Sequence, residues 1–182
     1  MKNSILYLSL FFILLLSGSN LLFGQISSSD IPPGIQNNID NELYPAVRVS
    51  VPDLEKIRAE DAFDDKHALP MRFAVSQPVR INVLREGIWM NLKDGLRICR
   101  LAVEAPGAQA MILYYSDFSI PDGAELFIYS ADKKQVAGAF TNLNNPDGGA
   151  FASEMIKGDH LIIEFSQPWN TNKEARLMID EV

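Results

Sequence analysis

The chain has 182 residues, of which 47% are hydrophobic and 21% charged, and its formal net charge is −7. This length fits one globular domain behind a leader segment. The acidic balance would repel a phosphate backbone, which argues against nucleic acid as a partner.

The first 24 residues have the pattern of a secretory signal peptide. A basic residue, Lys2, precedes an apolar run from Ile5 to Leu16, and small residues follow before an expected cleavage near Gly24. An uncleaved anchor is the alternative, because the stretch from Ile5 to Phe23 is nearly long enough to span a bilayer. The Ser-Gly-Ser-Asn interruption favours cleavage. We therefore predict a secreted chain, extracellular or periplasmic, without stable membrane insertion.

Residues 25–45 are rich in Ser, Asn, Asp, Pro and Gly and hold few bulky apolar groups. Such a composition predicts a flexible tether with little structure. We expect the folded domain to occupy residues 46–182. Its first strand is predicted at Val47–Val51, where Pro52 ends it.

The best helix candidate is Asp53–Phe63, in which Asp53 can cap the first turn while Leu54, Ile57 and Ala62 lie near one face. A piece this short is marginal without packing. The carboxylates near its end invite a metal hypothesis, since hard cations bind carboxylate oxygens, but their spacing matches no calcium loop. A solvated acidic turn is the favoured interpretation of this cluster, which comprises Glu60, Asp61, Asp64 and Asp65.

Short strands separated by turn signals make up most of the remaining chain. An extended run from Arg72 to Val83 contains Pro78, which is expected at a sheet edge, a bulge or a strand break. Turns such as Pro121-Asp122-Gly123 recur at roughly 8–12-residue intervals as far as Pro168. That spacing predicts an all-β fold, an antiparallel sandwich of about 8–9 strands. Leu177–Ile179 is predicted as a last edge strand.

Alternation within the strands indicates which side chains form the core. Cys99, Leu101 and Val103 share one strand face, while Arg100 and Glu104 share the other and should meet water or cross-strand partners. The next strand changes phase, and one extra residue near Ser116-Asp117, a β-bulge, would keep its apolar residues inward. We expect one dry layer between two sheets that contains Met111, Leu113, Tyr115, Phe118, Ile120, Leu161, Ile163 and Phe165.

No residue pattern predicts catalysis. His67 and His160 lie far apart and lack the spacing of a zinc-binding helix. A triad of Asp159, His160 and a serine can be written down, but no G-x-S-x-G or similar motif accompanies it. The one cysteine, Cys99, lies in an apolar strand and is expected to be buried and inert. We expect no enzyme activity, no catalytic residue, no cofactor and no metal site.

Four residues are candidates for partner contacts, and each also has a plain structural explanation. Trp89 and Trp169 lie near strand ends, where an aromatic ring can contact a ligand or pack at the rim of the core. Asn144 and Asp147 lie in a polar loop whose oxygens could bind calcium. Pro146 interrupts the pattern of a calcium loop, so a metal-free loop is favoured.

Several segments carry a family resemblance. They are EDAFDDKHALPMRFAV, then DGLRICRLAVEAPGAQAMILYYSDFSIPDGAELFIYS, VAGAFTNLNN and MIKGDHLIIEFSQP, in this order from about Glu60 to Pro168. Over this stretch, more than half of its length, the chain resembles the non-catalytic N-terminal domain of secreted trypsin-like serine endopeptidases of the lysyl endopeptidase type, as found in Bacteroidetes. The specificity lies in the order of the segments, since no single motif is diagnostic. The resemblance implies a jelly-roll sandwich, similar to the P-domain type.

Two departures from that family matter. The family usually has Trp at the position of Cys99, so neighbours must refill that volume or stability falls. Its cysteine-rich catalytic domain, with His, Asp and Ser, follows this region, whereas the chain stops at Val182. No catalytic residue therefore carries over.

The resemblance implies an accessory or pro-domain of a secreted serine endopeptidase, present as a truncated chain. Such a domain would help the protease fold, shield it, or hold its substrate. The implied partner is the protease catalytic domain, in cis. The alternative is a free-standing extracellular module that binds a glycan or a protein of the cell envelope.

Overall fold

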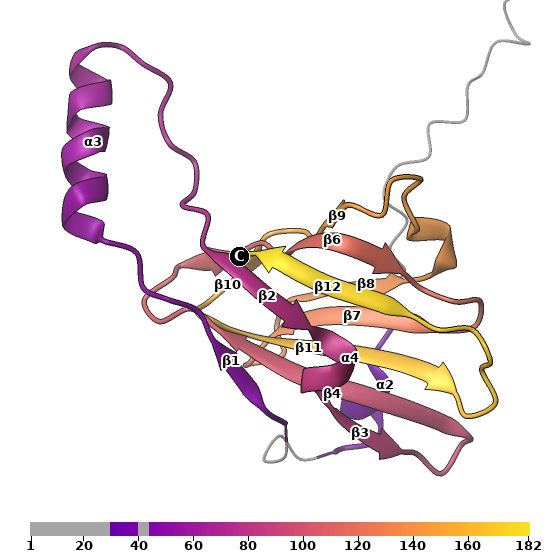
Figure 1. Cartoon of the computed structure of the whole chain (residues 1–182). Helices are drawn as coiled ribbons and strands as arrows, with labels where there is room; N and C mark the ends of the chain where they lie inside the picture. The colour runs from indigo at the N-terminus through magenta and orange to yellow at the C-terminus, as the bar shows by residue number, and fades with distance from the viewer. Residues whose placement is uncertain (1–29, 40–43) are drawn as a thin grey trace, which may run out of the picture.

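The computed structural model describes residues 30–39 and 44–182, and β-strands dominate them (Figure 1). The predicted all-β class is therefore confirmed. The strands form two main sheets that share one hydrophobic core, with a small two-stranded ladder at one end. The predicted signal peptide, residues 1–24, lies outside the described residues. Among the described residues, no helix combines the length and the apolarity needed to cross a bilayer.

The larger sheet, called sheet A here, has six strands in the order β1-β4-β11-β7-β8, with β3 also paired to β4. All of its pairings are antiparallel except that of β1 with β4. The strands are β1 (Ala46–Arg48), β3 (Ile88–Asn91), β4 (Leu96–Glu104), β7 (Glu125–Ser130), β8 (Val136–Phe140) and β11 (His160–Pro168).

The smaller sheet, sheet B, has four strands in the order β2-β12-β6-β9, and β5 pairs with β10 beside it. The C-terminal strand β12 lies between β2 and β6, so the expected last edge strand is an interior strand. Pro78 begins the edge strand β2, as its missing N–H requires. The strands are β2 (Pro78–Asn82), β5 (Ala110–Met111), β6 (Tyr114–Ser119), β9 (Phe151–Ala152), β10 (Ile156–Lys157) and β12 (Arg176–Glu181).

The described residues contain twelve strands rather than about 8–9. Three of them, β5, β9 and β10, are only two residues long, too short to show the alternation of a strand. The sequence predicts a short strand at 151–155, which contains β9, but it does not separate β5 from β6 and it places no strand at β10.

The core between the sheets follows the predicted alternation. The register of β6 against β12 pairs Met178 with Asp117 and Ile179 with Tyr115, which skips Ser116 and confirms the predicted β-bulge. All eight residues expected in the dry layer are buried in one cluster. Cys99, Leu101 and Val103 belong to the same cluster.

In the part of the chain that the structure describes, four short helical segments accompany the sheets. They are α2 (Pro33–Gln36), α3 (Leu54–Lys66), α4 (Val83–Glu86) and the 3₁₀ turn η2 (Asn142–Asn144). The predicted helix is confirmed as α3, with the Asp53 carboxylate accepting a hydrogen bond from Lys56 N at 3.1 Å. No residue of α3 is buried, and the helix stands away from both sheets (Figure 1). Val83, the last residue of the predicted extended run, begins α4.

The segment predicted as a flexible tether is partly ordered. Of residues 25–45, the structure describes 30–39 and 44–45, and there Pro32, Pro33 and Gly34 are buried. Ile35 and Tyr44 pack on the face of sheet A that points away from the core. The segment is mostly polar, so its composition did not indicate that Ile35 and Tyr44 pack on sheet A.

The small side chain at Cys99 is explained by Gly87. A β-carbon added to Gly87 would lie 2.5 Å from Cys99 Sγ and 2.7 Å from the backbone oxygen of Val83. The backbone of α4 therefore approaches β4 closely, and it occupies space that a larger residue at position 99 would need.

We predict that Gly87→Ala lowers the free energy of unfolding by about 1–3 kcal/mol, because the methyl group overpacks a site whose neighbours are largely backbone. Gly148→Ala is the matched control, since a β-carbon there meets nothing within 4 Å. Urea unfolding followed by tryptophan fluorescence measures both. Equal midpoints for the two variants would contradict the close approach.

Candidate binding surfaces

The segment 52–77, called the arm here, exposes large apolar side chains. It leaves sheet A after Val51, passes through α3, and returns extended to β2 (Figure 1). Phe73 is 79% exposed and Met71 83%, far more than a folded core allows. Leu54, Phe63 and Leu69 are exposed as well. Apolar groups gathered on one protruding segment are typical of a surface that another molecule covers.

The arm is held together by charge pairing. Arg72, on the returning segment, bonds Glu60 Oε2 at 2.6 Å and Asp61 Oδ1 at 3.0 Å on α3. Glu60 and Asp61 belong to the acidic cluster that raised the metal hypothesis, and here they are partners of a guanidinium. Among the described residues, no group of three or more His, Cys, Asp or Glu is arranged to hold a metal ion.

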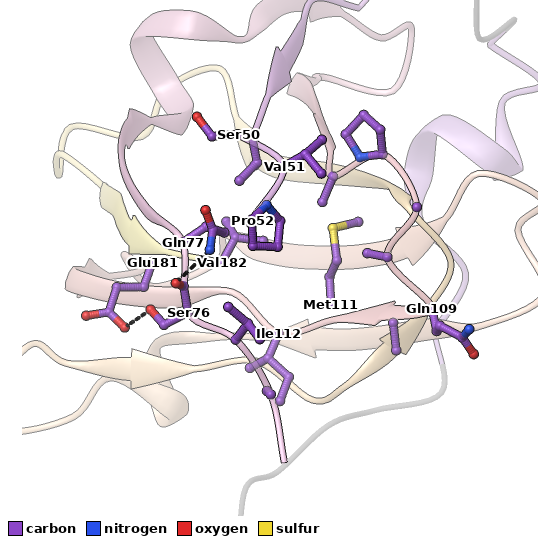
Figure 2. A pocket seen from close by; sticks show the side chains of 18 of the residues that line it. Ser50, Val51, Pro52, Ser76, Gln77, Gln109, Met111, Ile112, Glu181 and Val182 are labelled. Carbon is purple, nitrogen blue, oxygen red and sulfur yellow. Dashed lines mark hydrogen bonds between the residues drawn. The ribbon is translucent and has the colours of Figure 1, made fainter. Parts of the chain in front are cut away.

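A pocket of about 600 Å³ opens at the base of the arm. Both roots of the arm line it, together with the loop that carries β5 and the end of β12. In Figure 2, Val51, Pro52 and Met111 point toward the middle of the pocket, and Ser76 bonds Glu181 at its rim, at 2.7 Å. Mostly apolar walls with a few polar groups are usual for a ligand site. We call this hollow the arm pocket.

Extended backbone beside the arm pocket is open to pairing. Within the described residues, no hydrogen bond involves the backbone of Phe73, Ala74 or Val75, although Gln77 pairs with Val182 through two backbone bonds of 2.8 and 3.0 Å. Glu181 is the one charged side chain among the residues that line the pocket. The surface is therefore suited to an extended apolar segment, which can add backbone hydrogen bonds to such an edge.

The outer face of sheet A carries a buried charge network. Arg100 Nε lies 3.3 Å from Glu164 Oε2, and both side chains are almost fully buried. The Tyr129 hydroxyl donates to Glu164 Oε2 and accepts from Arg100 Nη2, each at 2.9 Å. Gly34 N donates to Glu164 Oε1 at 2.6 Å. The predicted cross-strand partner of Arg100 is therefore Glu164, directly opposite on β11.

The electrostatics of this network follow from its burial. Desolvation raises the pKa of the Glu164 carboxyl above its ordinary value, while the Gly34 N–H, the Tyr129 hydroxyl and the Arg100 charge act to lower it. Desolvation also raises the pKa of the Tyr129 hydroxyl, which therefore keeps its proton and remains a donor. Arg100, Tyr129 and Glu164 therefore form one buried polar network that is tied to Gly34 through the second carboxylate oxygen.

The two tryptophans proposed as contact residues lie at the margin of sheet A. Trp89 packs edge-on against Phe165, stacks under the Arg97 guanidinium at 4.7 Å, and donates its indole N–H to Leu84 O. Trp169 is 55% exposed and donates its indole N–H to Leu96 O at 2.6 Å. Both polar groups are bonded to the protein's own backbone, so the exposed ring faces are what a ligand could contact.

The two loop candidates lie in the segment after β8. Asn144 Oδ1 accepts a hydrogen bond from Thr141 N at 2.8 Å and closes a capping box around η2. Asp147 is exposed in the following turn. This loop meets the end of β6 through Asn145, whose side chain bonds the backbone of Ile120. The structure does not gather the four predicted contact residues into one site.

The residues considered for catalysis are engaged elsewhere. His160 Nδ1 lies 3.7 Å from Glu104 Oε1, and its ring packs edge-on against Tyr44. Asp159 Oδ2 accepts from the backbone of Gly107. Within the described residues, no hydrogen bond joins His160 to a serine hydroxyl. The triad that can be written from the sequence is not assembled.

No protein-family model and no solved structure matches the chain. The surfaces must therefore be interpreted from their own chemistry. Sequence reasoning missed the contact between Gly34 and Glu164 and the exposed arm. The sequence did contain one indication that a segment covers the outer face of sheet A. The strands β7 and β11 carry consecutive apolar residues, as strands that are buried on both faces do.

We predict that Cys99 in the native protein resists alkylation by iodoacetamide. Burial raises the pKa of its thiol to about 12, so almost no thiolate forms at neutral or mildly alkaline pH. Stability linked to this shift is present below the ordinary thiol pKa and is lost as the pH rises toward about 12. Mass spectrometry should find modification only in denaturant. Labelling of the native chain that increases between about pH 7 and pH 9 would contradict burial.

We predict that Glu164→Gln destabilises the fold by about 3–5 kcal/mol, because the amide keeps an acceptor for Gly34 but removes the negative charge that lies 3.3 Å from the buried Arg100 guanidinium. Glu104→Gln is the control on the neighbouring strand. Its carboxylate is partly exposed and its ion-pair partner within the described part of the chain is His160, so less than about 1 kcal/mol is expected. Chemical denaturation measures both, and a small effect for both would show that the buried pair is dispensable.

Proposed function

We propose that this chain is a non-catalytic, extracellular protein-binding module, the accessory or pro-domain of a secreted serine endopeptidase, and that it contacts the protease through the arm and the arm pocket. Within this proposal the two sheets form a jelly-roll sandwich and the chain reaches the outside of the cell through its predicted signal peptide. The module holds or shields its partner and performs no chemistry itself.

The observation that carries the proposal is the exposed apolar surface of the arm. Phe73 and Met71 are each about four-fifths exposed, and an apolar pocket of about 600 Å³ lies beside them. The net charge of −7 favours solubility of the unbound chain, in which this apolar surface is exposed. A protein partner is favoured over a small polar ligand, because the arm offers apolar side chains and unpaired backbone together.

The choice of a serine endopeptidase as partner rests on the resemblance of residues from about Glu60 to Pro168. That stretch contains most of the arm, including Phe63 and Phe73, and the loop that forms one wall of the arm pocket. The segment that carries the resemblance is therefore also the one that exposes the apolar surface.

A free-standing glycan-binding module is the alternative, and one observation favours it. Trp169 directly follows β11 and is 55% exposed, and an exposed aromatic face can stack on a sugar ring. Binding to a glycan array that is lost in Trp169→Ala and kept in Phe73→Ser would support this alternative over the protease partner.

The proposal is tested by titrating the secreted chain with the catalytic domain of a lysyl endopeptidase-type protease and measuring the dissociation constant by calorimetry. Phe73→Ser should weaken binding at least about tenfold, because an exposed aromatic anchor is removed. Leu143→Ser is the matched control, since Leu143 is 71% exposed in the loop after β8 and should leave affinity unchanged. Absence of binding by the unaltered chain, or equal loss in both variants, would overturn the proposal.

A further inference from the structure

We propose that the outer face of sheet A is a peptide-binding site, and that residues 30–39, called the strap here, fill it as a ligand would. The site recognises a Pro-Gly-aliphatic segment by the backbone N–H of its glycine. It is separate from the arm surface and does not depend on the function proposed above.

The directed contact is the bond from Gly34 N to Glu164 Oε1, at 2.6 Å. Glu164 lies in the middle of β11, and Arg100 and Tyr129 hold its other oxygen in place. The carboxylate is thereby preorganised as an acceptor before any segment arrives. A buried carboxylate left without this donor would lose a charge-assisted hydrogen bond in a site of low dielectric.

The site selects glycine by shape. A β-carbon on Gly34 would collide with the Glu164 carboxylate, so any other residue at this position would force that buried carboxylate out of its place. Gly34 lies within the helical turn α2, a conformation that alanine adopts readily. The glycine is therefore required by the close approach to Glu164 and not by its own backbone conformation.

Apolar contacts complete the site. Ile35 packs on a small cluster formed by Phe127, Tyr129, Ala139 and Ile162, all on the outer face of sheet A. Pro32 and Pro33 are buried beside it. This cluster is distinct from the core between the sheets, which includes no strap residue. The strap can therefore leave without unpacking the core.

Tyr44, which lies outside the strap, packs on the same outer-face cluster as Ile35. Its ring lies over the Arg100 guanidinium, with 5.0 Å between the ring centre and Cζ, and its edge meets His160. The site thus offers a carboxylate, an aliphatic patch and an aromatic wall. A Pro-Gly-Ile segment of another chain, including the strap of a second copy, has the chemistry to occupy it.

The test uses the whole secreted chain with a recognition site for a sequence-specific protease inserted after Asp40. Cutting there separates the strap from the body without touching Gly34 or Tyr44. A dye on the strap end reports its association by fluorescence anisotropy across a dilution series. Tryptophan emission from Trp89 and Trp169 verifies that the body stays folded.

We expect the cut strap to remain bound with a dissociation constant in the micromolar range or below, and to exchange with added synthetic peptide of residues 28–40. Gly34→Ala should weaken binding at least tenfold, whereas Gln36→Ala, at an exposed position of the same turn, should not change it.

Two outcomes would overturn the proposal. One is release of the unaltered strap on cutting, with a folded body and no rebinding at about 100 micromolar peptide, an affinity too weak for a site of its own. The other is equal affinity for Gly34→Ala and Gln36→Ala, which would show that the glycine contact does not hold the strap.

Discussion

The ion pair between Arg100 and Glu164 sets the architecture around it, because it places two charges on a sheet face that must then be covered. Charges removed from water require partners, and the neighbouring strands supply only some of them. The remaining donor comes from Gly34, more than a hundred residues earlier in the chain. The strap therefore covers the outer face of sheet A, while the other face of this sheet packs on the core.

With that face occupied, the arm still offers exposed apolar side chains to another molecule, above all Met71 and Phe73. The arm contributes nothing to the core, since no residue of α3 is buried. Its internal order comes from the Asp53 cap and the Arg72 pairing with Glu60 and Asp61. A segment held in shape by polar contacts while its apolar side chains face outward is organised for recognition rather than for stability.

The sequence predicted the parts of the fold that depend on local periodicity. Alternation along β4, β6 and β11 identified the core, and the phase change near Ser116 located the bulge. Periodicity carries no information about which segment covers a second face, so the docking of Gly34 on Glu164 was missed. It also cannot show that a helix such as α3 stands free, because a mixed polar surface is compatible with packing or exposure. The four predicted contact residues were chosen by residue type alone, and type does not determine position in space.

Amide hydrogen exchange of the secreted chain tests most directly whether the strap is docked and the arm is open, because it measures the protection of both segments in one experiment. We expect strong protection of the Gly34 amide, which is bonded to a buried carboxylate, together with exchange near the unstructured rate for Phe73, Ala74 and Val75. Rapid exchange at Gly34, or protection along Phe73–Val75 in the isolated chain, would contradict it.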